Sequence, residues 1–164
     1  MKKTLLKFLD FYIKSSIHVA LSVVSLASIS LSLSQYELSI SMLIFIFCIA
    51  LFAYNFIKFF PIIREITNHD FPYIIFLLSL LCLLLSLYLF IQLTFLSKIV
   101  VVTGGILVLL YTLPMNKSLN NLRNTKGWKV YLVVLTWILI TVCLPFLSTT
   151  IFDIRLFIQL VLIQ

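Results

Sequence analysis

Five long stretches without a charged side chain limit what this chain can fold into. They cover residues 15–36, 38–57, 71–97, 99–116 and 130–152. A helix rises about 1.5 Å per residue and the hydrocarbon core of a bilayer is about 30 Å thick, so about 20 apolar residues are needed to cross it. Each stretch is therefore long enough for one membrane-spanning helix, the fourth by the smallest margin.

The composition agrees with a membrane protein. Of the 164 residues, 63% are hydrophobic and 10% are charged, which is far too little polar surface to cover a soluble domain. We predict an all-α, polytopic transmembrane helical bundle that forms a single domain over residues 1–164. Residues 156–164, after Arg155, are apolar but too few to cross a bilayer, and we interpret them as the start of a sixth span.

The N-terminal segment 1–14 differs from the spans because charged and apolar residues alternate in it with helical spacing. Its charged side chains recur every three or four positions, and its apolar side chains fall elsewhere on the helical wheel. The charged residues that follow this spacing are Lys3, Lys7, Asp10 and Lys14, and apolar residues between them include Leu5, Phe8, Leu9 and Tyr12. This pattern predicts an amphipathic helix that lies on the membrane surface before the first span.

The basic residues predict the orientation, because short loops rich in lysine and arginine stay on the cytoplasmic side. If the N-terminus is cytoplasmic, ten of the twelve basic residues lie on that side, and only Lys98 and Arg155 lie on the other. The formal charge of +7 then reflects topology and contact with anionic lipid headgroups rather than nucleic acid. The three cysteines fall inside apolar stretches, and we interpret them as packing residues.

Polar residues recur with helical spacing inside the spans, and lipid cannot satisfy such a stripe. We therefore expect the stripe of the first span, with His18, Ser22 and Ser25, to face protein or a cavity. Packing is the alternative for its serines, which can bond to carbonyls of their own helix. In the fourth span, Gly104 and Gly105 would allow a neighbouring backbone to approach closely.

The motifs of soluble enzymes are absent from the sequence: it has no phosphate-binding glycine loop, no nucleophile elbow and no zinc-binding histidine pair. The segment 59–71 contains Glu65 and Asp70, which are few carboxylates for a divalent cation. We interpret this segment as a solvated loop. No metal site and no cofactor are predicted.

Two short segments resemble a known family. The first is Tyr-Asn-Phe-Ile-Lys-Phe at 54–59, and the second is Leu-Tyr-Thr-Leu-Pro at 110–114 with the basic residues that follow it. Together they resemble the UbiA family of membrane prenyltransferases, in particular divergent bacterial members, of which the chain would represent the N-terminal part. In that family an aspartate-rich motif opened by asparagine follows the second span, and a motif with tyrosine and lysine follows the fourth.

The resemblance implies that Asn55 matches the motif asparagine and that Tyr111 and Lys117 match a pair that contacts diphosphate. The chain departs from the pattern where the aspartates are expected, because Phe59 and Ile63 stand there. A second aspartate motif would lie beyond Gln164. Prenyl transfer in the family requires Mg²⁺ at both motifs, so we predict no catalytic and no metal-binding residue here.

Two functions follow from these observations. In the first, a UbiA-like protein with degenerate or missing Mg²⁺ motifs binds an isoprenoid or quinone-like lipid, acts with a second subunit that supplies the missing helices, and, if active, is a prenyltransferase-like transferase. In the second, the chain is a non-enzymatic membrane scaffold or accessory subunit. A half-transporter is disfavoured because no internal repeat is evident. The implied location is a bacterial inner membrane, and the implied partners are membrane lipids.

The predicted ligand-binding residues all lie near the cytoplasmic ends of the spans, where a compact bundle would bring them to one side of the membrane. We expect them to line a cationic mouth for an anionic or polar lipid head, with the tail along Ser22 and Cys48. In the alternative, the lysines extend to the headgroups without a specific contact. The six residues are Lys14, His18, Asn55, Lys58, Tyr111 and Lys117.

Overall fold

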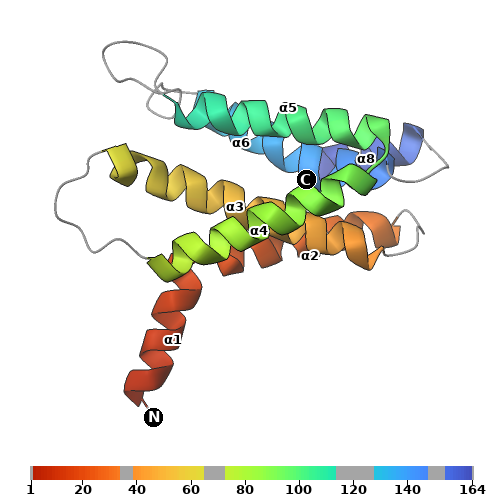
Figure 1. The fold of residues 1–164 in the computed structure, drawn as a ribbon. Helices are drawn as coiled ribbons and strands as arrows, with labels where there is room; N and C mark the ends of the chain where they lie inside the picture. Colours follow the sequence, from red (N-terminus) through yellow and green to blue (C-terminus); the bar gives the residue numbers. More distant parts are fainter. Residues whose placement is uncertain (1, 34–38, 65–72, 114–127, 148–153, 164) are drawn as a thin grey trace.

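The computed structural model describes residues 2–33, 39–64, 73–113, 128–147 and 154–163. Within these ranges every regular element is helical, and the helices form a bundle, as predicted (Figure 1). Four helices are long and apolar enough to cross a membrane, and a bent pair at the N-terminus makes a fifth candidate. The chain is therefore a multi-pass, all-α membrane protein.

The N-terminal pair consists of α1, Lys2–Lys14, and α2, Ile17–Leu33, which are bent by 63° at the intervening residues. Ser16 ends α1 with a left-handed backbone, φ 60°, and its carbonyl oxygen accepts the first hydrogen bonds of α2. The bend separates the amphipathic segment from the first span, and α1 projects away from the bundle (Figure 1).

The centre of the bundle is α3, Ile40–Arg64, which packs against α2 on one side and α4, Tyr73–Gln92, on the other. Its side chains Phe45, Ile46 and Leu51 are almost completely buried. The buried face of α2 consists of small and β-branched residues such as Ala20 and Val23. Close packing around α3 therefore holds the first three spans together.

The boundary between the third and fourth spans differs from the prediction. Thr94 caps the N-terminus of α5, Phe95–Thr112, where its side chain accepts a hydrogen bond from the backbone of Ser97. Lys98, which the prediction placed in the loop, lies in the first turn of α5. The charge pattern located the turn four residues too late because a helix start is determined by its capping residue rather than by the nearest charge.

The fifth span is built from α6, Trp128–Ile138, a π-helical turn at Leu139–Cys143, and α7, Leu144–Leu147. Pro145 has no backbone N–H to donate, which explains an irregular turn just before it. The π turn packs against α2, α5 and α6, so the fifth span closes the bundle opposite α4. A short helix, α8, Ile154–Ile163, follows and packs on the π turn.

Candidate functional site

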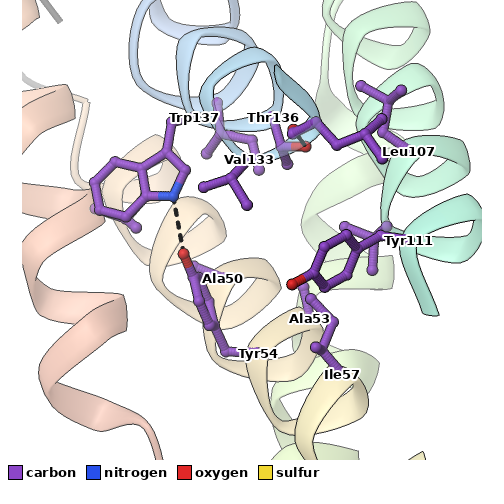
Figure 2. Close-up of a pocket in the computed structure, with 13 residues that line it drawn as sticks. Ala50, Ala53, Tyr54, Ile57, Leu107, Tyr111, Val133, Thr136 and Trp137 are labelled. Carbon is purple, nitrogen blue, oxygen red and sulfur yellow. Dashed lines mark hydrogen bonds between the residues drawn. The ribbon is translucent and has the colours of Figure 1, made fainter. Parts of the chain in front are cut away.

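Three polar aromatic side chains line a cavity of about 120 Å³ between α2, α3, α5 and α6. Tyr54 comes from α3, Tyr111 from α5 and Trp137 from α6 (Figure 2). The Trp137 Nε1 donates a hydrogen bond of 2.9 Å to the hydroxyl oxygen of Tyr54. The Tyr111 hydroxyl points into the same space from the opposite wall.

The remaining walls of this cavity are almost entirely apolar. Ala50 and Ala53 leave room on α3, and Leu107, Val133 and Ile140 complete the surface. Thr136 also lines the cavity. Its hydroxyl donates to the carbonyl oxygen of Leu132 in its own helix. The polar side-chain groups available to a ligand in this cavity are therefore the hydroxyls of Tyr54 and Tyr111.

A second cavity, of about 360 Å³, lies beside the first between α3, α4, α5 and the π turn. Both cavities are bordered by Ala53, Val108 and Ile140. The wall of the second cavity includes Gly104 and Gly105, where an added Cβ would meet no atom of another helix within 4 Å in the described part of the chain. The prediction that these glycines admit a neighbouring backbone is therefore wrong; they border open space instead.

The structure brings Lys14 and Lys58 together at the bend between α1 and α2. The Nζ of Lys58 donates a hydrogen bond of 2.8 Å to the carbonyl oxygen of Lys14, which is one of the last carbonyls of α1. The Nζ of Lys14 pairs with the Oδ2 of Asp10 over 2.7 Å. Both lysines thus have partners within the protein, and Lys58 joins α3 to the end of α1.

His18 lies in the first turn of α2, directly after the bend, and its ring packs against that of Tyr12 with centroids 5.8 Å apart. Its Nδ1 is buried, and no partner for it lies within the described part of the chain. Ser22 and Ser25, which follow His18 on the predicted stripe, are exposed and donate to carbonyl oxygens of α2. These bonds confirm the alternative interpretation for the serines, that they bond to carbonyls of their own helix. The expectation that this stripe faces protein or a cavity is wrong for Ser22 and Ser25, because both are exposed.

Asn55 belongs to a different contact. It is 2% exposed, and its Nδ2 donates a hydrogen bond of 2.8 Å to the Oγ of Ser79 on α4. It borders a small cavity between α3 and α4, whereas Tyr111 borders the cavity between α3, α5 and α6. The predicted ligand-binding residues therefore lie at three separate positions, near Lys14, near Asn55 and near Tyr111. Lys117 lies outside the described residues.

The comparisons with known proteins add no relative. The chain matches no family model, no curated protein and no solved structure. The function has to be argued from the cavities themselves.

Sequence reasoning identified Tyr111 but missed Tyr54 and Trp137 as a pair. Tyrosine and tryptophan normally concentrate at the membrane interfaces, where their polar ends reach water. Trp137 instead falls inside the fifth predicted span, so its N–H group needed a partner within the protein, whereas Tyr54 lies near the end of the second span, where a tyrosine is common. The position of Trp137 was the available signal, although its separation of 83 residues from Tyr54 hides the pairing.

Proposed function

We propose that this chain is a UbiA-like membrane protein that binds an isoprenoid or quinone-like lipid without carrying a complete catalytic site. The observation that supports binding is the cavity bordered by Tyr54, Tyr111 and Trp137, with two phenols on an otherwise apolar surface. The oxygen of Tyr54 accepts from Trp137, so its own hydrogen is left to donate. Two phenol donors suit a head that carries carbonyl or other acceptor oxygens.

The tail of such a lipid has room in the second cavity. The two cavities have three lining residues in common, and the wall of the second is almost wholly apolar. An isoprenoid chain is apolar, and burying it there removes surface from contact with the surrounding lipid at little cost in polar groups. The head would then lie between Tyr54 and Tyr111, and the tail would pass Ala53 toward Gly104.

Binding without prenyl transfer follows from the positions of the family's aspartates. Phe59 stands in one of them, and in the structure its ring borders an apolar cavity beside Asn55. A phenyl ring cannot hold the Mg²⁺ that a leaving diphosphate needs. The proposed location is a bacterial inner membrane with the N-terminus in the cytoplasm.

A second candidate function is a non-enzymatic scaffold or accessory subunit. It is favoured by the wide unburied surfaces of two spans, since only 22% of the α4 span and 17% of the α5 span are buried inside the chain. A second subunit that supplies further helices would cover these surfaces. In that case the aromatic pair at Tyr54 and Trp137 would serve packing alone.

Quenching of tryptophan fluorescence by a quinone distinguishes the lipid-binding function from the scaffold function. The chain has two tryptophans, so a Trp128→Phe background leaves Trp137 as the reporter beside the cavity. A short-chain quinone should quench it saturably in lipid nanodiscs. Tyr111→Phe should weaken the apparent affinity by about 5- to 10-fold, which corresponds to about 1–1.4 kcal/mol for one lost hydrogen bond.

The matched control is Tyr88→Phe, because Tyr88 is an exposed tyrosine on α4. Its affinity for the quinone should equal that of the parent. Quenching that rises linearly without saturation, or that is equal in the Tyr111→Phe and Tyr88→Phe variants, would favour the scaffold.

A further inference from the structure

A buried side-chain oxygen without a hydrogen-bond donor lies between α3 and α4, away from the Tyr54 cavity. The Oγ of Ser79 donates to the carbonyl oxygen of Ile75 over 2.8 Å, so its hydrogen is used. Asn55 must therefore present its NH₂ group to Ser79, and its Oδ1 is the atom left over. No donor for this buried oxygen is found in the described part of the chain.

An unsatisfied acceptor inside a membrane span is costly, because no bulk water is at hand to replace the missing donor. Beside Asn55 lies a cavity of about 80 Å³. Four phenylalanines line it, and Phe52 and Phe56 stack with ring centroids 6.0 Å apart. The exposed side chain of Leu80 on α4 also lines it, so the cavity is bordered on one side by the lipid-facing surface.

We propose that this cavity is a binding site for the hydroxyl group of a membrane alcohol. The O–H of the alcohol donates to the Oδ1 of Asn55, and the adjoining methylene groups pack among the phenyl rings. The chain of the alcohol leaves past Leu80 into the bilayer. The site has no lining residue in common with the cavity at Tyr54, although Phe52 and Phe56 also line the second cavity. It is proposed from Asn55 and does not rest on the lipid proposed at Tyr54.

An ammonium group is a poorer occupant. The attraction of a cation to an aromatic face is weaker than the desolvation penalty of burying an ion without a counter-charge. Beside Asn55 the lining consists of phenylalanine, leucine and serine, and Lys58 stands one turn further along α3. A neutral donor satisfies the same oxygen without the desolvation of a charge.

Water is also a poorer occupant than an alcohol. A buried water needs two to four polar partners, and the polar atoms that line the cavity come from Asn55 and Ser79 alone. The rest of the wall is phenyl and aliphatic carbon, which suits the methylene groups of an alcohol. A hydroxyl group with an apolar chain therefore matches both parts of the cavity.

Photolabelling of the full chain in lipid nanodiscs tests the proposal. The probe is hexadecanol with a diazirine beside the carbinol carbon, and the readout is the labelled peptide found by mass spectrometry. Saturable labelling is expected at Phe76 or Leu80. Unlabelled hexadecanol should compete for it, whereas hexadecyl methyl ether should not, because the ether keeps the oxygen but has no hydrogen to donate.

Two variants keep the test decisive. Asn55→Leu removes the acceptor and should reduce labelling at least 10-fold, and Leu80→Trp should block the cavity with Asn55 still in place. The control Thr103→Val alters an exposed α5 hydroxyl that already bonds to the carbonyl oxygen of Ile99, and it should label like the parent. All variants are first shown to be monodisperse by gel filtration.

Four results would overturn the proposal. Competition by the ether equal to that by the alcohol would show that no hydrogen is donated, and unchanged labelling in Asn55→Leu would show that Asn55 is not the acceptor. Stronger competition by hexadecylamine would assign the cavity to a cation. The absence of saturable labelling at Phe76 and Leu80 would leave water as the occupant.

Discussion

The indole Nε1 of Trp137 on α6 donates a hydrogen bond of 2.9 Å to the hydroxyl oxygen of Tyr54 on α3. This bond joins the second span to the fifth at the edge of the cavity that Tyr54, Tyr111 and Trp137 line. It holds the Tyr54 ring in one position and leaves its hydroxyl hydrogen for a ligand. The contact therefore serves both packing and the proposed head site.

We expect Tyr54→Phe to lower the free energy of unfolding by about 1–2 kcal/mol, because the N–H of Trp137 would remain buried without its acceptor. Reversible unfolding in bicelles with increasing sodium dodecyl sulfate would measure the change. Tyr88→Phe, on the exposed face of α4, should change it by less than about 0.5 kcal/mol. Equal changes in the free energy of unfolding of the two variants would show that the bond between Trp137 and Tyr54 does not stabilise the protein.

The contact between Asn55 and Ser79 gives a second prediction. Ser79→Ala would leave the Nδ2 of Asn55 buried without an acceptor, so we expect a loss of about 1–3 kcal/mol in the free energy of unfolding. Ser86→Ala is the control, because the Ser86 hydroxyl bonds to the carbonyl oxygen of Leu83 within α4. Its loss should stay below about 0.5 kcal/mol. A Ser79→Ala variant as stable as Ser86→Ala would contradict the contact.

This contact also corrects a design based on the sequence. Helical spacing alone does not show that Ser79 contacts Asn55, so Ser79→Ala would look like a neutral control for ligand binding by Asn55. In the structure Ser79 fixes the amide of Asn55, so the two residues cannot serve as test and control for each other. Thr103, whose hydroxyl is satisfied within α5, is the better control.

Lys58 gives a third prediction, which concerns the bend after α1. Its Nζ bonds to the carbonyl oxygen of Lys14, and hydrogen bonds to charged groups contribute about 1.5–3 kcal/mol. Lys58→Met should therefore speed amide hydrogen exchange in the last turn of α1 by about 10-fold or more. Lys98→Met, at the start of α5, should leave α1 unchanged. Equal exchange in the two variants would show that Lys58 does not hold α1.

Orientation in the membrane gives a fourth prediction. Reporter fusions at Asn120 should show the cytoplasmic side, and fusions at Tyr36 should show the opposite side, because ten of the twelve basic residues then remain in the cytoplasm. A fusion at Asn120 that reports the outer face would reverse the topology. It would also remove the correspondence between the chain's loops and those of the UbiA family.

The fold class was predictable because bilayer thickness alone fixes how many apolar residues a span needs. The helix ends were less predictable, because they depend on caps such as Thr94 and on a left-handed residue such as Ser16. The π turn before Pro145 was likewise not predicted. These features involve a few local hydrogen bonds that hydrophobicity does not report.

The site was only partly predictable for a similar reason. Helical spacing groups residues on one helix, but it does not say which neighbour that face meets. Asn55 and Tyr54 are adjacent in sequence, yet Asn55 bonds to α4 and Tyr54 bonds to α6. Adjacent positions on a helix point about 100° apart, so Tyr54 faces the cavity of Tyr111 and Asn55 does not. Asn55 and Tyr111, which were predicted to share one mouth, therefore border separate cavities.

Native mass spectrometry of the chain released from membranes tests the central claim most directly. The parent should retain an isoprenoid or quinone-like lipid. Ala53→Trp should lose it, because Ala53 lines both cavities and the indole would fill them. Leu84→Trp, on the exposed face of α4, should retain the lipid. A parent that carries only phospholipid, or an Ala53→Trp variant that retains the same lipid, would contradict the account.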